Sequence, residues 1–325
     1  MKYFFHTLLI IIFIINFVSI IKANSIKIAV LKYGSVNWEY NVIKHHKLDK
    51  KNNVKIQKVE VTNKDASAVA FLSKSVDIFV TDWIWVSKQR NKGNLVSFLP
   101  YSNSAGSLMI KKGEEINSFL DLKNKKIGVA GGSLDKSWLF LRAYAIKKYE
   151  KDPLTFFKTS FAAPPLINGL LRNGQLDAGY NYWNYTARLQ ALGYEEFLTL
   201  KDILPYIGIE GELPLIGYVF RDGFVQKNEE TLHGFIKASN EARKILKTSD
   251  NEWLRISEMT GAKNQLMLEK IRDGFRKGIP SDNHQLMRKN IQHAYEILSQ
   301  IGGEELVGNS SSLASGTYWN KQNDY

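Results

Sequence analysis

The chain has 325 residues, of which 44 are lysine or arginine and 32 aspartate or glutamate, so its formal net charge is +12. Hydrophobic residues make up 44% and charged residues 23%, which is typical of a folded globular protein and excludes a disordered chain. Cysteine is absent, which excludes disulfide scaffolds, zinc–cysteine and iron–sulfur sites, cysteine nucleophiles and lipid-anchored lipoproteins. The lysines are scattered along the chain, so we expect a solvated surface and no nucleic-acid partner.

Residues 1–23 have the features of a secretory signal peptide. Lys2 supplies a positive charge, a long apolar run follows, and Ala23 offers a cleavage site before Asn24. The apolar run is also long enough for an uncleaved anchor, but Asn16 and Ser19 weaken it. We therefore expect a cleaved signal and an exported protein.

Strands and helices alternate through the first third of the remaining chain. Apolar or period-two runs predict strands, and the stretches between them predict helices. The predicted strands are residues 26–33, 54–61 and 76–82, and the predicted helices are residues 36–47, 65–73 and 83–88. This alternation indicates parallel sheets built from βαβ units.

The second part of the chain repeats the first. Residues 76–85 align without a gap with residues 176–185, a displacement of 100 positions. The aligned pairs include Asp77 with Asp177, Trp83 with Trp183, and Gly93 with Gly193. Chance similarity between two βα units is the alternative, but the matched tryptophans and glycines favour a duplication that gives two similar α/β lobes.

Two extended segments provide crossings between these lobes. They lie within residues 101–112 and 214–220, and the chain after residue 228 is largely helical. We expect these last helices to pack on the first lobe. The predicted organisation is a signal peptide (1–23), a first lobe (24–104 and 218–325) and a second lobe (105–217).

Ligands of open α/β sheets bind at the carboxyl ends of the strands. Four such ends carry polar, glycine and aromatic residues, and in facing lobes they converge on one site. The candidate binding residues are Gly34, Ser35, Trp38, Thr81, Asp82, Trp83, Gly132, Ser133, Asn181, Tyr182 and Trp183.

Two of these strand ends have a more specific chemistry. Gly131 and Gly132 precede Ser133, which we place at the N-cap of a helix, so that backbone N–H groups cradle an anion; a plain helix cap is the alternative. Asp82 either pairs with a cationic part of the ligand beside Trp83 or caps the helix that begins there.

No motif supports catalysis. The histidines lack the spacing of a zinc site, and no G-x-S-x-G elbow is found. We therefore predict no catalytic residue, no metal and no cofactor.

The order of elements, the crossings, and the motifs D-W-I-W-V-S-K-Q-R, G-V-A-G-G-S-L-D-K-S-W, A-A-P-P-L and L-P-L-I-G-Y-V-F give the chain a family resemblance. It resembles the periplasmic substrate-binding proteins of ABC importers, of the nitrate/sulfonate/taurine type, which share their fold with the thiamine-pyrimidine synthase family. The resemblance implies an α/β protein with the type-two periplasmic-binding-protein fold, two lobes of sheet flanked by helices and joined by two crossing segments.

The resemblance also implies a function. Such a monomer closes its lobes on a small anionic or zwitterionic solute, such as a sulfonate, and delivers it to the permease and ATPase of the inner membrane. The pyrimidine synthase and the desulfinase of this fold need cysteine, and this chain has none. The alternatives are a binder of a pyrimidine or another flat heterocycle, and an exported enzyme or sensor-input protein on the same scaffold.

Overall fold

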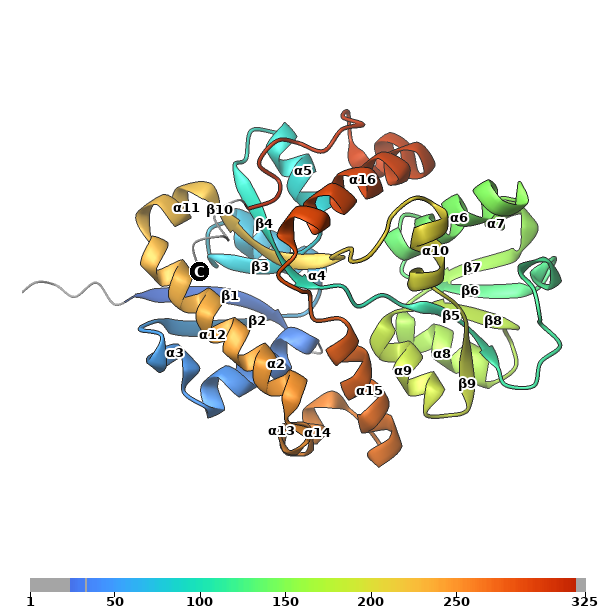
Figure 1. The fold of residues 1–325 in the computed structure, drawn as a ribbon, viewed down its shortest axis with the longest axis horizontal. Coiled ribbons are helices and arrows are strands. Elements are labelled where there is room, and N and C mark those ends of the chain that lie inside the picture. The colour runs from blue at the N-terminus through green and yellow to red at the C-terminus, as the bar shows by residue number, and fades with distance from the viewer. Residues whose placement is uncertain (1–23, 33, 320–325) are drawn as a thin grey trace, which may run out of the picture.

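The computed structural model describes residues 24–32 and 34–319, which form two five-stranded mixed sheets flanked by helices (Figure 1). We call the sheet that begins the chain, with the helices packed on it, the first lobe, and the other sheet with its helices the second lobe. No helix within the described ranges is long and apolar enough to cross a membrane. The predicted signal peptide lies outside these ranges.

The first sheet combines parallel strands from the start of the chain with a strand that returns much later. Its order is β2 (Lys55–Val61), β1 (Ser25–Leu31), β3 (Ile78–Thr81), β10 (Ile216–Arg221) and β4 (Val96–Ser102). β1 runs parallel to β2 and β3, whereas β10 is antiparallel to both of its neighbours. The carboxyl ends of β1, β2 and β3 therefore lie at one edge of the sheet.

The second sheet has the same plan. Its order is β7 (Lys158–Ala162), β6 (Lys126–Ala130), β8 (Ala178–Asn181), β5 (Ser107–Lys111) and β9 (Tyr194–Thr199). β6 is parallel to β7 and β8, and β5 is antiparallel to β8 and β9. The antiparallel strand is the one that enters this lobe, whereas in the first lobe it is the one that returns.

One pair of aligned residues has the same role in both sheets. The Asp77 carboxylate accepts a hydrogen bond from the backbone N–H of Lys27 at 2.9 Å, and the Asp177 carboxylate accepts one from the N–H of Lys126 at 2.7 Å. Each aspartate thus ties the start of the third parallel strand of its lobe to the start of the first parallel strand. The shared strand order and this shared contact agree with the predicted duplication.

Helices cover the sheets as the βαβ pattern predicts. Those of the first lobe are α2 (Ser35–His45), α3 (Leu48–Lys51), α4 (Lys64–Leu72) and α5 (Trp83–Asn91). Those of the second are η1 (Phe119–Leu122), α6 (Lys136–Tyr149), α7 (Pro153–Phe156), α8 (Pro164–Arg172), α9 (Trp183–Gln190) and α10 (Leu200–Tyr206). The C-terminal helices are α11 (Asp222–Lys227), α12 (Glu229–Thr248), α13 (Asp250–Arg255), α14 (Ser257–Thr260), α15 (Gln265–Lys277) and α16 (His284–Val307).

The C-terminal helices contact both lobes, so the prediction that they pack on the first lobe was only partly right. α12 packs on α2, α3 and β1 of the first lobe. In contrast, α15 packs against α9, and α16 packs against both α5 and α6 (Figure 1). These contacts flank the crossings, because the N–H of Asn103 donates to Gly278 O at 2.8 Å, and the Asn290 amide donates to Glu210 O and Glu212 O. The exact lobe boundaries stay a prediction.

Candidate functional site

The carboxyl ends of the parallel strands meet at the junction of the two lobes, and an ion pair joins them there. Asp82 follows β3 of the first lobe, and Lys136 begins α6 of the second. The Lys136 ammonium lies 2.7 Å from Asp82 Oδ2. Because both side chains are largely buried, this pair is shielded from solvent better than an ordinary surface pair.

Asp82 also caps a helix, as one of its two predicted roles required. Its Oδ1 accepts the backbone N–H of Trp85 at 2.9 Å, at the N-terminus of α5. Burial by itself would raise the pKa of Asp82, but the charge and hydrogen bond of Lys136 and the bond from Trp85 outweigh it, so the pKa is lowered. Both carboxylate oxygens therefore have partners, which leaves little capacity for a cationic ligand.

A second lysine reaches across the junction in the opposite direction. Lys64, the first residue of α4, places its ammonium 5.5 Å from the centre of the Tyr182 ring in the second lobe. Loss of solvent around this ammonium and the neighbouring charge of Lys136 lower the pKa of Lys64. Its ammonium has no hydrogen-bond acceptor among the described residues. The junction thus holds a cation with three unused donors.

The glycine loop after β6 lies beside this lysine. Ser133 was predicted to cap the following helix, but this was wrong: Asp135 Oδ1 accepts the N–H groups of Ser137 and Trp138 at 3.0 and 3.3 Å, and Ser133 is exposed. Asp135 caps α6 in place of Ser133 because it lies directly before the first helical residue and presents a negative charge to the helix N-terminus. In the described part of the chain, the N–H groups of Gly132 and Ser133 have no acceptor.

Tyr182 closes over this loop from the end of β8. A Cβ atom on Gly131, whose φ is +90°, would lie 2.7 Å from the Tyr182 hydroxyl, so only glycine fits there. Burial, the charge of Asp135 and a hydrogen bond with Asp135 raise the pKa of Tyr182 well above its ordinary value. The Tyr182 hydroxyl is therefore a fixed donor next to the loop.

Aromatic side chains from both lobes form a cluster at the same junction. The rings of Trp38 and Trp183 meet edge to face at 6.1 Å, and Trp253 and Phe275 of the C-terminal helices complete the cluster. The Trp38 indole N–H donates to Met259 O at 3.1 Å. Trp183 also lies 3.1 Å from the position of a Cβ on Gly274 in α15. These contacts make the cluster a packing surface between the lobes.

Two other predicted site residues have different roles. Trp83 is 0% exposed, and its indole N–H donates to Pro214 O at 2.8 Å, so we leave it out of the proposed site. The buried Asn181 amide donates to Pro164 O and Asn168 Oδ1, and its Oδ1 accepts the Tyr182 N–H. Asn181 therefore positions Tyr182. Gly34, Ser35 and Thr81 lie at the strand ends, partly buried, where they were predicted.

Sequence reasoning missed Lys64, Lys136 and Asp135. All three are the first residue of a helix or the residue just before it, following a strand whose carboxyl end faces the junction. That position was a usable signal, because it places a side chain at the sheet edge where ligands bind. Because lysine is scattered along the whole sequence, Lys64 and Lys136 did not stand out as candidates.

Behind the N-terminus of α2, a glutamate is buried with one oxygen unpaired. Glu39 is 1% exposed, and its Oε1 accepts the Tyr218 hydroxyl at 2.6 Å. Its Oε2 is buried and has no hydrogen-bond partner in the part of the chain that the structure describes. Burial raises the pKa of Glu39, and the charge of Arg243 and the bonds from Tyr218 and Ser239 only partly oppose this.

Replacing Glu39 by glutamine should change how stability depends on pH. A carboxyl group with a raised pKa in the folded state holds its proton more tightly than in the unfolded state, so it lowers the free energy of unfolding as the pH rises above 4.5, by about 1.4 kcal/mol for each unit of pKa difference. Glu39→Gln removes this loss. In urea unfolding from pH 4.5 to 8, the variant should gain stability over the wild type as the pH rises, whereas Glu230→Gln, at an exposed position, should follow the wild type. A constant difference would contradict the assignment.

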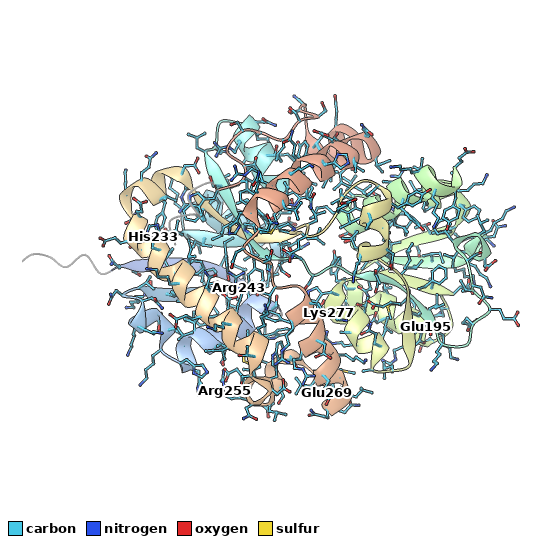
Figure 2. The ribbon with its side chains drawn as sticks, in the orientation of Figure 1. Glu195, His233, Arg243, Arg255, Glu269 and Lys277 are labelled. Atoms are coloured by element: carbon cyan, nitrogen blue, oxygen red, sulfur yellow. The ribbon has the colours of Figure 1, made fainter. Side chains whose placement is uncertain are left out.

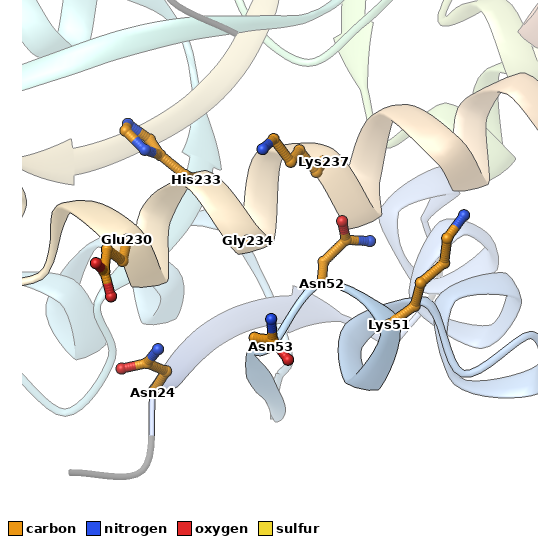
Figure 3. Close-up of a pocket in the computed structure, with 8 residues that line it drawn as sticks. All are labelled: Asn24, Lys51, Asn52, Asn53, Glu230, His233, Gly234 and Lys237. Carbon is orange, nitrogen blue, oxygen red and sulfur yellow. The ribbon is translucent and has the colours of Figure 1, made fainter. Parts of the chain in front are cut away.

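A pocket of about 520 Å³ lies elsewhere in the first lobe, at the amino end of β1 (Figure 3). It is lined by Asn24, Lys51, Asn52, Asn53, Glu230, His233, Gly234 and Lys237. The seven residues of β1 span about 20 Å, which separates this pocket from the junction at the strand's carboxyl end. No group of three or more potential metal ligands occurs among the described side chains.

Comparisons with known proteins identify a family and a fold for this chain. A family model described as NMT1/THI5 like matches residues 50–250. No curated protein matches the sequence.

Solved structures match nearly the whole chain. The periplasmic aliphatic sulphonate binding protein SsuA from Escherichia coli has a TM-score of 0.70 at 17% identity, covering 91% of this chain and 94% of that one. The alkanesulfonate-binding protein SsuA from Xanthomonas axonopodis pv. citri, bound to MOPS, has a TM-score of 0.67 at 14% identity, covering 91% and 98%. A putative periplasmic sulfonate-binding protein from Methylobacillus flagellatus KT has a TM-score of 0.64 at 15% identity, covering 90% and 89%. The predicted periplasmic-binding-protein fold is therefore confirmed.

Proposed function

Because the chain belongs to the NMT1/THI5-like family and has the periplasmic-binding-protein fold, we propose that it is an exported solute-binding protein of an ABC import system. It captures a small anionic or zwitterionic organic solute between its two lobes and hands it to a membrane permease. It acts as a periplasmic monomer and catalyses no reaction. Proteins of the same fold are described as sulfonate-binding, which supports a sulfonate as the type of solute.

The observation that carries this proposal is the set of unused donors at the lobe junction. The N–H groups of Gly132 and Ser133 and the Lys64 ammonium have no acceptor among the described residues. Lys64 and Ser133 are exposed and Gly132 is half-buried, so these donors are accessible, and an anionic group of a ligand can accept charge-assisted hydrogen bonds from all three. Asp82, in contrast, already has two partners.

A flat heterocycle has less support. Stacking needs a free aromatic face, but the Trp38 and Trp183 rings pack edge to face and a lysine covers the Tyr182 ring. The alternative from a different functional class is an exported enzyme or a sensor-input protein on the same scaffold. A gene for a permease beside this one would favour transport, and a gene for a kinase or chemoreceptor would favour sensing.

A thermal-shift screen tests the proposal, because a solute that binds only the folded protein raises its melting temperature. We expect small sulfonates or related anions to raise it by several degrees at about 100 times their Kd, where linkage contributes about 2.7 kcal/mol. The solute should be recovered chemically unchanged after long incubation. Lys64→Met, which removes one of the three donors, should reduce the shift, and a screen without any stabilising solute would contradict solute binding.

A further inference from the structure

Two buried polar atoms of the first lobe have no hydrogen-bond partner among the described residues, and they belong to one network. One is Glu39 Oε2 on α2, and the other is Arg243 Nε on α12. The Arg243 charge acts on Glu39, yet the two side chains form no ion pair within 4.0 Å among the described residues. The other polar atoms of the two side chains have partners: Glu39 Oε1 accepts from Tyr218, and the terminal nitrogens of Arg243 donate to Tyr101 O at 3.4 Å and to Asn240 Oδ1.

This network borders the junction of the two lobes, where the proposed solute site lies. Trp38 and Glu39 follow Ser35 by three and four residues, so each lies beside Ser35 on the surface of α2. Ser35 begins the helix at the strand end and accepts the Tyr101 hydroxyl at 3.4 Å. Trp38 touches the second lobe through Trp183. Figure 2 shows Arg243 further along α12 than His233, on the side nearer the second lobe.

Glu39 Oε2 and Arg243 Nε require different kinds of hydrogen-bond partner. Glu39 Oε2 needs a donor, and the N–H of Arg243 Nε needs an acceptor. Leaving either atom unsatisfied in a buried position is costly, and more so for charged groups. A hydroxyl group both donates and accepts, whereas an ammonium only donates and is repelled by the guanidinium.

We propose that Glu39 and Arg243 form an inner subsite that takes a hydroxyl group of the solute. This inference rests on the proposed function and sharpens it: the solute is a small hydroxylated anion, with the anionic group at the junction and the hydroxyl beside α2. Glu39 is then a specificity-determining residue.

Equilibrium titrations with matched probes test the subsite. Ethanesulfonate, 2-hydroxyethanesulfonate and taurine share one anionic group and differ only at the other end, and propionate, 3-hydroxypropionate and β-alanine form the same series for carboxylates. In at least one series, we expect the hydroxylated probe to bind about 10- to 100-fold more tightly than the unsubstituted one, as for a hydrogen bond to a charged group. The amino compound should bind less tightly than the hydroxylated one.

Variants separate the subsite from the rest of the site. Glu39→Gln keeps the side-chain shape and can still accept from Tyr218, but it then presents an N–H donor in place of Oε2. The hydroxyl preference should disappear in this variant and persist in Glu230→Gln, with both variants folded in thermal melts.

The outcomes distinguish the two proposals. Equal affinities within each series, or a preference that survives Glu39→Gln, would overturn the subsite and leave solute binding standing. Tightest binding of the amino compounds would overturn the hydroxyl assignment. Binding of neither series would contradict the proposed function, and the subsite with it.

Discussion

Replacing Lys64 by methionine should weaken solute binding about 10- to 100-fold. The ammonium lies between the lobes and has no acceptor among the described residues, so a bound anion would gain a charge-assisted hydrogen bond that methionine cannot supply. Methionine keeps the length and apolar stem of lysine, which limits any loss of packing. Isothermal titration of the wild type and the variant with the same sulfonate measures the effect.

The matched control is Lys237→Met. Lys237 is an exposed lysine that lines the pocket at the amino end of β1, away from the junction (Figure 3). The Lys237→Met substitution removes the same charge from the protein and leaves the proposed site unchanged. Equal affinities for Lys64→Met and Lys237→Met would show that Lys64 contributes only to net charge, and the assignment of the anion site would fail.

Gly106→Ala should destabilise the folded protein by about 3 kcal/mol or prevent folding, because overpacking next to backbone cannot be relieved by a side-chain rotation. Gly106 lies in the first crossing, and a Cβ atom there would be 1.6 Å from the Asn181 carbonyl oxygen and 2.6 Å from its carbon. The chain must therefore pass this close to the end of β8 as it enters the second lobe. Urea unfolding followed by far-UV circular dichroism measures the change.

Gly132→Ala provides the comparison for this prediction. A Cβ atom at Gly132 would meet no atom of the described residues within 4 Å, and the φ of Gly132 is not in the left-handed region, so the free energy of unfolding should change by less than about 0.5 kcal/mol. If Gly106→Ala is as stable as Gly132→Ala, the crossing does not pass the end of β8 as the structure has it.

The sequence was sufficient to predict the architecture, because the signals for it are local or repetitive. The period-two run at residues 54–61 forms β2. The displacement of 100 residues identified β8 as the counterpart of β3 in the duplicated plan. The crossings followed from two extended segments that interrupt the repeat. The packing of α15 on α9 could not be predicted, since it depends on where a distant segment folds back.

The site was predicted by position but not by chemistry. Strand ends identified Asp82 and the glycine loop, yet nothing local shows that Lys136 reaches Asp82 from 54 residues away. The cap at Asp135, rather than Ser133, depends on where α6 begins, a boundary that periodicity does not fix to within two residues. Burial also decides which aromatic residues are available: Trp83 and Trp183 align in sequence, but the first is in the core and the second lies between the lobes.

A crystal structure of the protein with the solute that most raises its melting temperature tests the central claim most directly. We predict that the solute lies between the lobes, with its anionic group bound by the N–H groups of Gly132 and Ser133 and by the Lys64 ammonium. A solute bound away from this junction, for example between Lys51 and Lys237 in the pocket of the first lobe, would contradict the account.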